Sequence, residues 1–131
     1  MLAVEWLKTW EGLINACDYQ NARLLFAPDV IGFGTVAGAT HGIDQLEAMQ
    51  WRKIWPTIRN FRFDAPLINI ACHGNPELAV IATTWRSDGR TGDEGWYKRR
   101  GRTTLLLRDS GNTFACIHSH FSMEPGTPAL E

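Results

Sequence analysis

The feature that most constrains the fold is a long hairpin pattern near the end of the chain. Trp96 to Arg108 has the composition of a long strand, and Asp109-Ser110-Gly111-Asn112 is a turn signal. Thr113 to Met123 then forms a second strand-like segment. A hairpin of this length is not stable alone and needs further strands or helices to cover one face. The C-terminal half therefore predicts a sheet.

Two further segments extend this sheet toward the N-terminus. Leu78 to Arg86 is an almost continuous run of apolar and β-branched residues, as expected for a strand covered on both faces. Phe61 to Ala71 alternates more loosely, and Pro66 predicts an edge or a bulge in its middle. The polar stretch from Ser87 to Gly95 is predicted to be a loop.

The first half of the chain carries helical patterns. Between Val4 and Asn15, four apolar residues lie on one helical stripe, which predicts an amphipathic helix; they are Trp6, Trp10, Leu13 and Ile14. A short helix is expected from Ala22 to Phe26, ended by Pro28. A third begins with Asp44 as its N-cap and runs to about Trp55. Val30 to Val36 is strand-like, although its two glycines indicate a bend.

Helices followed by antiparallel strands indicate an α+β fold with helices on one face of a curved sheet. A length of 131 residues, with 44% hydrophobic and 21% charged residues, fits a single domain covering 1–131. We expect its core at about 4–123 and a tail at 124–131. The net charge of -1 argues against nucleic acid or a membrane as a partner.

Cysteine usage and hydropathy bear on location and cofactors. Cys17, Cys72 and Cys116 are odd in number and lack metal-type spacing, which favours a reducing compartment. No run of about 18 apolar residues predicts a membrane span. We therefore expect a cytoplasmic protein without a metal or cofactor.

Polar chemistry is concentrated on the last two predicted strands. Because strand side chains alternate, His118, His120 and Ser122 share one face of the final strand. Two imidazoles in register suit an acid/base or anion site, although histidines in sheets are often only structural. On the preceding strand Lys98, Arg100 and Arg102 share a face, and Arg99 points to the opposite one.

Several segments together resemble the SnoaL-like branch of the nuclear transport factor 2-like superfamily. They are Leu25-Phe26-Ala27-Pro28-Asp29-Val30, Gly42 before a helix, Gly101-Arg102-Thr103-Thr104-Leu105-Leu106-Leu107, and His118-Ser119-His120-Phe121-Ser122. The resemblance implies a cone-shaped roll, in which a strongly curved sheet and early helices enclose a pocket. It also implies a homodimer through the outer face of the sheet. Members include isomerases, cyclases, dehydratases and non-catalytic association domains, so the resemblance does not fix the function.

The ketosteroid isomerase chemistry of this superfamily is not matched by the sequence. That chemistry requires a carboxylate base, a tyrosine and a protonated aspartic acid. Aligned by the resemblance, these positions fall near Gly34, Trp10 and Leu105. None of these residues can supply the required group.

The leading hypothesis is therefore a pocket that binds a small polar or anionic organic molecule. Arg102 would be the anchor, because a guanidinium pairs well with carboxylates and phosphates. His118, His120 and Ser122 would supply hydrogen bonds, and the walls would be aromatic: Trp85, Trp51, Trp55 and Phe33.

Two alternatives stay open at this point. The same pocket could belong to an acid/base enzyme in which His118 or His120 pairs with Asp18 or Asp29 as a general base. The domain could instead be a non-catalytic dimerisation module with a filled cavity. For Arg102 itself, a purely structural role also stays open, as a hydrogen-bonded strut to Asp18 or to a helix C-terminus.

Overall fold

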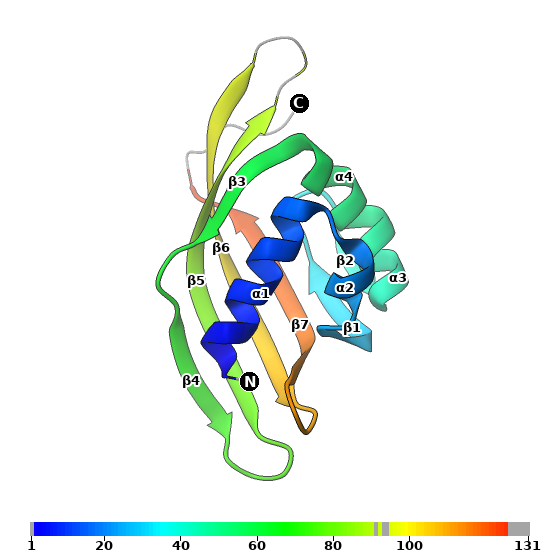
Figure 1. Ribbon diagram of the computed structural model, residues 1–131, viewed down its shortest axis with the longest axis vertical. Helices are drawn as coiled ribbons and strands as arrows, with labels where there is room; N and C mark the ends of the chain where they lie inside the picture. The colour runs from blue at the N-terminus through cyan, green and yellow to red at the C-terminus, as the bar shows by residue number, and fades with distance from the viewer. Residues whose placement is uncertain (1, 91, 93–94, 126–131) are drawn as a thin grey trace.

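A computed structural model describes residues 2–90, 92 and 95–125. It contains one sheet with the strand order β2-β1-β7-β6-β5-β3, and β4 pairs with β5 as well (Figure 1). All strand pairs are antiparallel except β1 with β7. The helices lie together on the concave face of this sheet (Figure 1). The predicted α+β roll is confirmed.

The strands are β1 (Phe26–Phe33), β2 (Ala39–His41), β3 (Ile58–Phe63), β4 (Leu67–Cys72), β5 (Leu78–Arg90), β6 (Trp96–Asp109) and β7 (Phe114–Met123). The predicted hairpin thus forms as β6 and β7. The break around Pro66 separates β3 from β4, as expected for a residue without a backbone N–H. β5 continues four residues beyond the predicted Arg86, so the predicted loop is shorter. Its residues 91, 93 and 94, and residues 126–131 of the predicted tail, lie outside the described residues.

The helical elements are α1 (Ala3–Ala16), α2 (Tyr19–Arg23), α3 (Ile43–Leu46), the π-helical turn η1 (Glu47–Trp51), α4 (Arg52–Ile54) and the 3-10 turn η2 (Trp55–Thr57). The predicted third helix is therefore one helical stretch with an irregular centre. Its N-cap is Gly42 rather than Asp44, whose carboxylate instead accepts a 2.6 Å hydrogen bond from Arg23. The expected helix from Ala22 to Phe26 was wrong in its second half, because Phe26 already begins β1 beside Cys116 of β7.

An aromatic cluster joins the helices to the sheet. The ring of Trp10 on α1 lies 5.0 Å from Phe26, 5.5 Å from Phe121 and 6.4 Å from Trp51. Trp51 in turn stacks on Trp55 at 4.7 Å. Each buried ring contributes a large apolar area, so this cluster supplies much of the hydrophobic stabilisation.

Helix α1 also covers the free edge of β3. Asn15 Oδ1 accepts a 2.8 Å hydrogen bond from Phe61 N, and Asn15 Nδ2 donates to Phe61 O at 2.9 Å. Glu11 Oε1 accepts from Phe63 N at 2.7 Å. These side chains take the positions that a neighbouring strand would otherwise occupy, so the edge is satisfied within the chain.

Replacing Asn15 with alanine is expected to lower the free energy of unfolding by about 1 kcal/mol or more, because the backbone groups of Phe61 lose both partners. Denaturant unfolding would measure the loss. Thr9→Ala, at an exposed position of the same helix, controls for the change in helix propensity. Equal stability of the two variants would contradict a role for Asn15 at the sheet edge.

Candidate functional site

A cavity lies between the concave face of the sheet and the helices. The volume that the centre of a water molecule can occupy in this cavity is about 40 Å³. One water needs roughly 10–15 Å³ on this measure, so the cavity can hold a few waters or a small organic group. The lining is largely aromatic and aliphatic: Trp10, Ile14, Phe33, Thr35, Leu46, Gln50, Trp51, Ile54, Trp55, Ile58, Phe61, Trp85, Arg99, Ser119 and Phe121.

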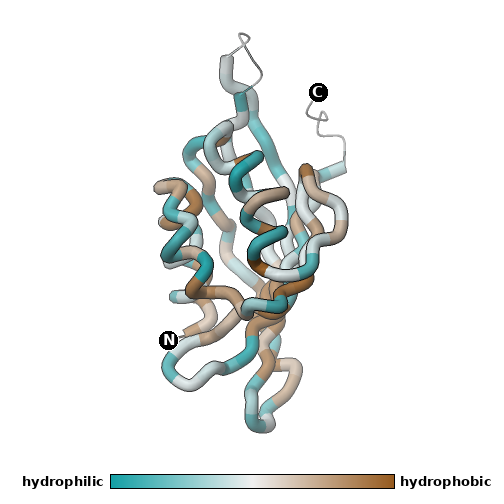
Figure 2. The backbone as a smooth tube through the Cα atoms, turned by 90° about the vertical axis from the view of Figure 1, so that its right-hand side faces the viewer, coloured by the Kyte–Doolittle hydropathy of each residue, from teal (hydrophilic) through white to brown (hydrophobic). Residues whose placement is uncertain are grey.

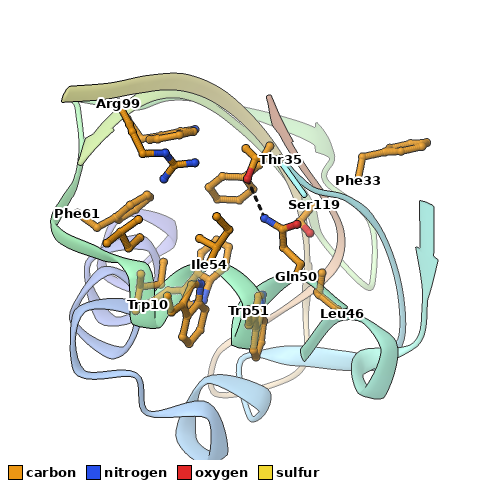
Figure 3. Close-up of a pocket in the computed structure, with 15 residues that line it drawn as sticks. Trp10, Phe33, Thr35, Leu46, Gln50, Trp51, Ile54, Phe61, Arg99 and Ser119 are labelled. Carbon is orange, nitrogen blue, oxygen red and sulfur yellow. Dashed lines mark hydrogen bonds between the residues drawn. The ribbon is translucent and has the colours of Figure 1, made fainter. Parts of the chain in front are cut away.

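Arg99 is the charged residue of this lining. It is 1% exposed, and its guanidinium points into the space beside Phe61 (Figure 3). Its two polar contacts are long, at 3.4 Å to Ser87 Oγ and 3.6 Å to Met123 Sδ. Arg99 Nε is buried without a hydrogen-bond partner, and no carboxylate of the described residues forms an ion pair with the guanidinium.

The surroundings of Arg99 make its charge costly. Burial lowers the pKa of the Arg99 guanidinium, and the neighbouring Tyr97 partly offsets this effect. The guanidinium carbon lies 5.2 Å from the centre of the Trp85 ring, a cation–π contact that stabilises the charge in part. A buried, incompletely bonded cation of this kind is well suited to an anion that enters the cavity.

Strand alternation and a glycine place Arg99 there. In β6 the buried side chains of Leu105 and Leu107 mark the inner face. Arg99 precedes them by six and eight residues, both even numbers, so strand alternation puts it on the same face. Gly89 of β5 provides the space that the Arg99 side chain occupies, since a β-carbon at position 89 would overlap that side chain. The sequence prediction that Arg99 points opposite to Lys98, Arg100 and Arg102 is confirmed.

Two tryptophans add further unused donors. Trp10 Nε1 and Trp85 Nε1 are buried without partners, and both residues line the cavity. Trp85 fits against Gly101 of the paired strand, where a β-carbon would overlap its indole ring. The polar atoms that lack partners on these three residues are all N–H donors, so the cavity favours a ligand rich in acceptors.

Gln50 closes one side of the cavity. Its Oε1 accepts hydrogen bonds from Val36 N at 3.0 Å and Ala37 N at 2.8 Å, and its Nε2 donates to Thr35 Oγ1 at 3.0 Å (Figure 3). The Gln50 side chain packs directly against Gly34, and any larger residue at position 34 would place its β-carbon in that side chain. Gln50 lies in the π-helical turn η1, a type of irregularity that is frequent at functional sites.

Of the four aromatic residues predicted as cavity walls, three are buried in the lining and one lies at the rim. Trp51, Trp55 and Trp85 are buried and line the cavity. Phe33 contributes to its rim, but its ring points away from the cavity and is 44% exposed (Figure 3). It contacts His120 on the outer face, with ring centroids 5.1 Å apart.

The four predicted polar site residues do not line the cavity. Arg102, His118, His120 and Ser122 lie on the outer face of the sheet, where Arg102 pairs with Ser122. The alternation from His118 to Met123 was predicted correctly, with Ser119 and Phe121 as the residues that face inward. Before His118 it was wrong, because a register shift against β6 makes Cys116, and not Ile117, the next buried residue. His118 Nδ1 lies 2.9 Å from Ile31 O, so this imidazole bonds to the backbone of the adjacent strand.

Asp18 and Asp29 do not complete an acid/base pair with these histidines. Asp18 caps α2 by accepting from Asn21 N, and Asp29 is exposed on β1. In the part of the chain that the structure describes, no group of three or more His, Cys, Asp or Glu side chains lies close enough to hold a metal ion. No helix among the described residues has the length and apolar character to cross a membrane.

Sequence reasoning missed Arg99, Gln50, Thr35 and Ser119 as site residues. A usable signal existed for Arg99, since it shares the alternation of Leu105 and Leu107. Gln50 had no comparable signal, because its role depends on the loop after β1 folding back over an irregular helical turn.

Comparison with known proteins agrees with this architecture. A family model described as a SnoaL-like domain matches residues 4–125. The chain belongs to the SnoaL-like family. No curated protein matches the sequence of this SnoaL-like chain.

Solved structures share the fold of this SnoaL-like chain at low sequence identity. A putative calcium/calmodulin-dependent protein kinase II association domain from Xanthomonas campestris is 15% identical, with a TM-score of 0.78, covering 92% of this chain and 84% of that one. A nuclear transport factor 2-like superfamily protein from Salmonella enterica is 20% identical, with a TM-score of 0.76 and coverage of 97% and 92%. The beta subunit of benzoate 1,2-dioxygenase from Burkholderia mallei is 10% identical, with a TM-score of 0.71 and coverage of 92% and 87%.

Gly101→Ala is expected to destabilise this SnoaL-like domain by about 1–3 kcal/mol or more, because the added methyl group would overlap both the Trp85 indole in the cavity wall and the backbone oxygen of Ser122 in β7. Gly12→Ala is the matched control, since Gly12 lies in α1 with no atom near its β-carbon position. This control should instead gain about 0.5–1 kcal/mol. Thermal unfolding of both variants tests the prediction, and a neutral Gly101→Ala would contradict the proposed packing.

Proposed function

We propose that this SnoaL-like protein binds a small anionic organic molecule, such as a carboxylate, in the interior cavity, with Arg99 as its anchor. The observation that carries the proposal is the buried guanidinium without a carboxylate partner among the described residues. The sequence-based hypothesis of an anion site is kept, and its anchor moves from Arg102 on the outer face to Arg99.

The energetics of the buried Arg99 charge support an anionic ligand. An unpaired charge in an apolar cavity is unfavourable, and an entering carboxylate can accept two parallel hydrogen bonds from the guanidinium fork. The donors Trp10 Nε1 and Trp85 Nε1 line the same cavity. A ligand that accepts these bonds would relieve several unsatisfied groups at once.

The size and walls of the cavity restrict the ligand further. About 40 Å³ suits a short acid, and the stacked pair Trp51 and Trp55 offers an apolar surface to its carbon atoms. This volume is too small for bulky steroid-like ketones. The described lining residues also offer such ketones hydrogen-bond donors but no carboxyl or imidazole group for acid/base chemistry.

The lining favours binding over acid/base catalysis. Among the described lining residues there is no His, Asp, Glu, Lys or Cys, so no side chain there can readily exchange a proton near neutral pH. The enzymatic alternative with His118 or His120 would require chemistry on the outer face, where both histidines lie.

Arg99→Met is expected to abolish ligand binding and to raise the free energy of unfolding by about 1 kcal/mol or more, because it replaces a buried unpaired charge by an apolar chain. The test is a thermal-shift screen with pairs of acids and their neutral amides, such as acetate with acetamide and benzoate with benzamide. A ligand at a hundredfold excess over Kd stabilises the native state by about 2.7 kcal/mol.

Arg102→Ala is the matched control in this screen, since it removes an arginine of the same strand from the outer face. We expect it to retain the shift caused by the acids. Loss of the shift in Arg102→Ala but not in Arg99→Met would restore Arg102 as the anchor. Equal shifts by acids and amides would contradict an anion site.

A second candidate function is assembly through the outer face of the sheet. Ile31 and Phe33 are 50% and 44% exposed there, next to His118 and His120. Two of the structural neighbours are named as an association domain and a dioxygenase subunit. An exposed apolar patch of this kind supports a homodimer, as the resemblance implied.

We further propose that the protein is cytoplasmic, which the free thiols of Cys17, Cys72 and Cys116 support.

Phe33→Glu is expected to convert a dimer into a monomer, because it introduces a charge into the apolar patch. Leu24→Glu is the control, since Leu24 is 75% exposed at the end of α2, away from this patch. Light scattering after size exclusion measures the mass. A wild-type protein that is monomeric at high concentration would remove this candidate.

A further inference from the structure

A row of three arginines crosses the outer face of the sheet. Arg62 of β3 pairs with Arg86 of β5, and Arg86 pairs with Arg100 of β6. All three are exposed. Neighbouring strands lie about 4.8 Å apart, so the row places three guanidinium groups across two strand spacings.

The charges of this row are poorly compensated. Arg86 lies 3.8 Å from Asp64 Oδ1, a long and exposed ion pair, and Arg62 donates to the backbone oxygen of Phe61. Arg100 takes part in no ion pair among the described residues. Like charges placed directly opposite each other destabilise a sheet. The row therefore costs stability in the isolated protein.

The basic surface continues along β6. Lys98 and Arg102 flank Arg100 on the same face, and Asp88 neutralises part of the charge by accepting from Lys98, Asn60 and Arg59. A groove runs over this area, and Arg62, Arg86, Lys98 and Arg100 are among the residues that line it. The upper part of the β5–β6 arm is accordingly hydrophilic (Figure 2).

We propose that this groove binds an extended acidic segment of a partner protein, with carboxylates at alternate positions. Lys98, Arg100 and Arg102 lie two residues apart along β6, a spacing of roughly 6.5–7 Å. An extended peptide presents every second side chain at the same spacing. Successive carboxylates can pair with Arg100 and Arg102, which form no ion pair among the described residues, whereas Lys98 is shared with Asp88. The arginines of β3 and β5 can add forked hydrogen bonds.

The charge distribution favours a short acidic segment over a polynucleotide. Residues 2–57 carry more acidic than basic side chains, so the helical side of the molecule would repel a long anionic chain. A peptide that contacts only the groove avoids this repulsion. The groove lies over β3, β5 and β6, apart from the apolar patch on β1 and β7. Arg99 borders both the groove and the interior cavity, but the residues proposed to bind the peptide do not line that cavity.

The test is fluorescence anisotropy at low salt with a labelled peptide of alternating glutamate and serine. The control peptide has the same composition in Glu-Glu-Ser-Ser order. We expect the alternating peptide to bind more tightly, and its affinity to fall with salt. The variant Arg86→Glu/Arg100→Glu should lose about tenfold or more in affinity. Lys53→Glu/Arg108→Glu changes the net charge equally at two positions that do not line the groove, and it should bind as the unchanged protein does.

Arg86→Gln provides a second test that does not depend on a charge reversal. It should weaken peptide binding and leave the melting temperature equal or higher, because it relieves repulsion within the row. A lower melting temperature would show that the row is structural and overturn the proposal. Three other results would do the same: no binding of either peptide, equal losses in the two double variants, or tighter binding of a single-stranded oligonucleotide of equal charge.

Discussion

Packing of Trp10 against the concave face of the sheet is the interaction on which the rest of the structure depends. Its ring contacts aromatic residues of β1, β3, β7 and the η1 turn, so one side chain joins both layers of the domain. The same ring also lines the cavity. Core and cavity therefore share their walls, and a change that loosens one is expected to alter the other.

Arg99 is the exception to this apolar packing. In a closely packed core a cation without a counterion is unfavourable, yet β6 and Gly89 hold it in place with little freedom. An anion that pairs with Arg99, as proposed above, would offset this cost. The expected stability of Arg99→Met and its expected loss of binding are thus two consequences of one arrangement.

Much of the fold could be predicted from sequence because its signals are local. The stripe of Trp6, Trp10 and Ile14, the hairpin turn at Gly111 and the alternation around Leu105 each act within a few residues. Which face of β7 turns inward depends on its pairing with β6, and this pairing joins residues that are far apart in the sequence. The polar residues His118 and His120 suggested the wrong face, whereas the apolar neighbours in β6 indicate the right one.

The covered edge of β3 has a further consequence. The edge strand at the other end of the sheet, β2, has three residues, so it offers little to a chain that would pair with it. At β2 and β3 the sheet therefore offers few free backbone groups to another strand, whereas β4, which pairs with β5 alone among the described strands, keeps an exposed outer edge. Pairing with a strand of another molecule is thereby disfavoured at β2 and β3, and the exposed edge of β4 is the position at which such pairing would occur.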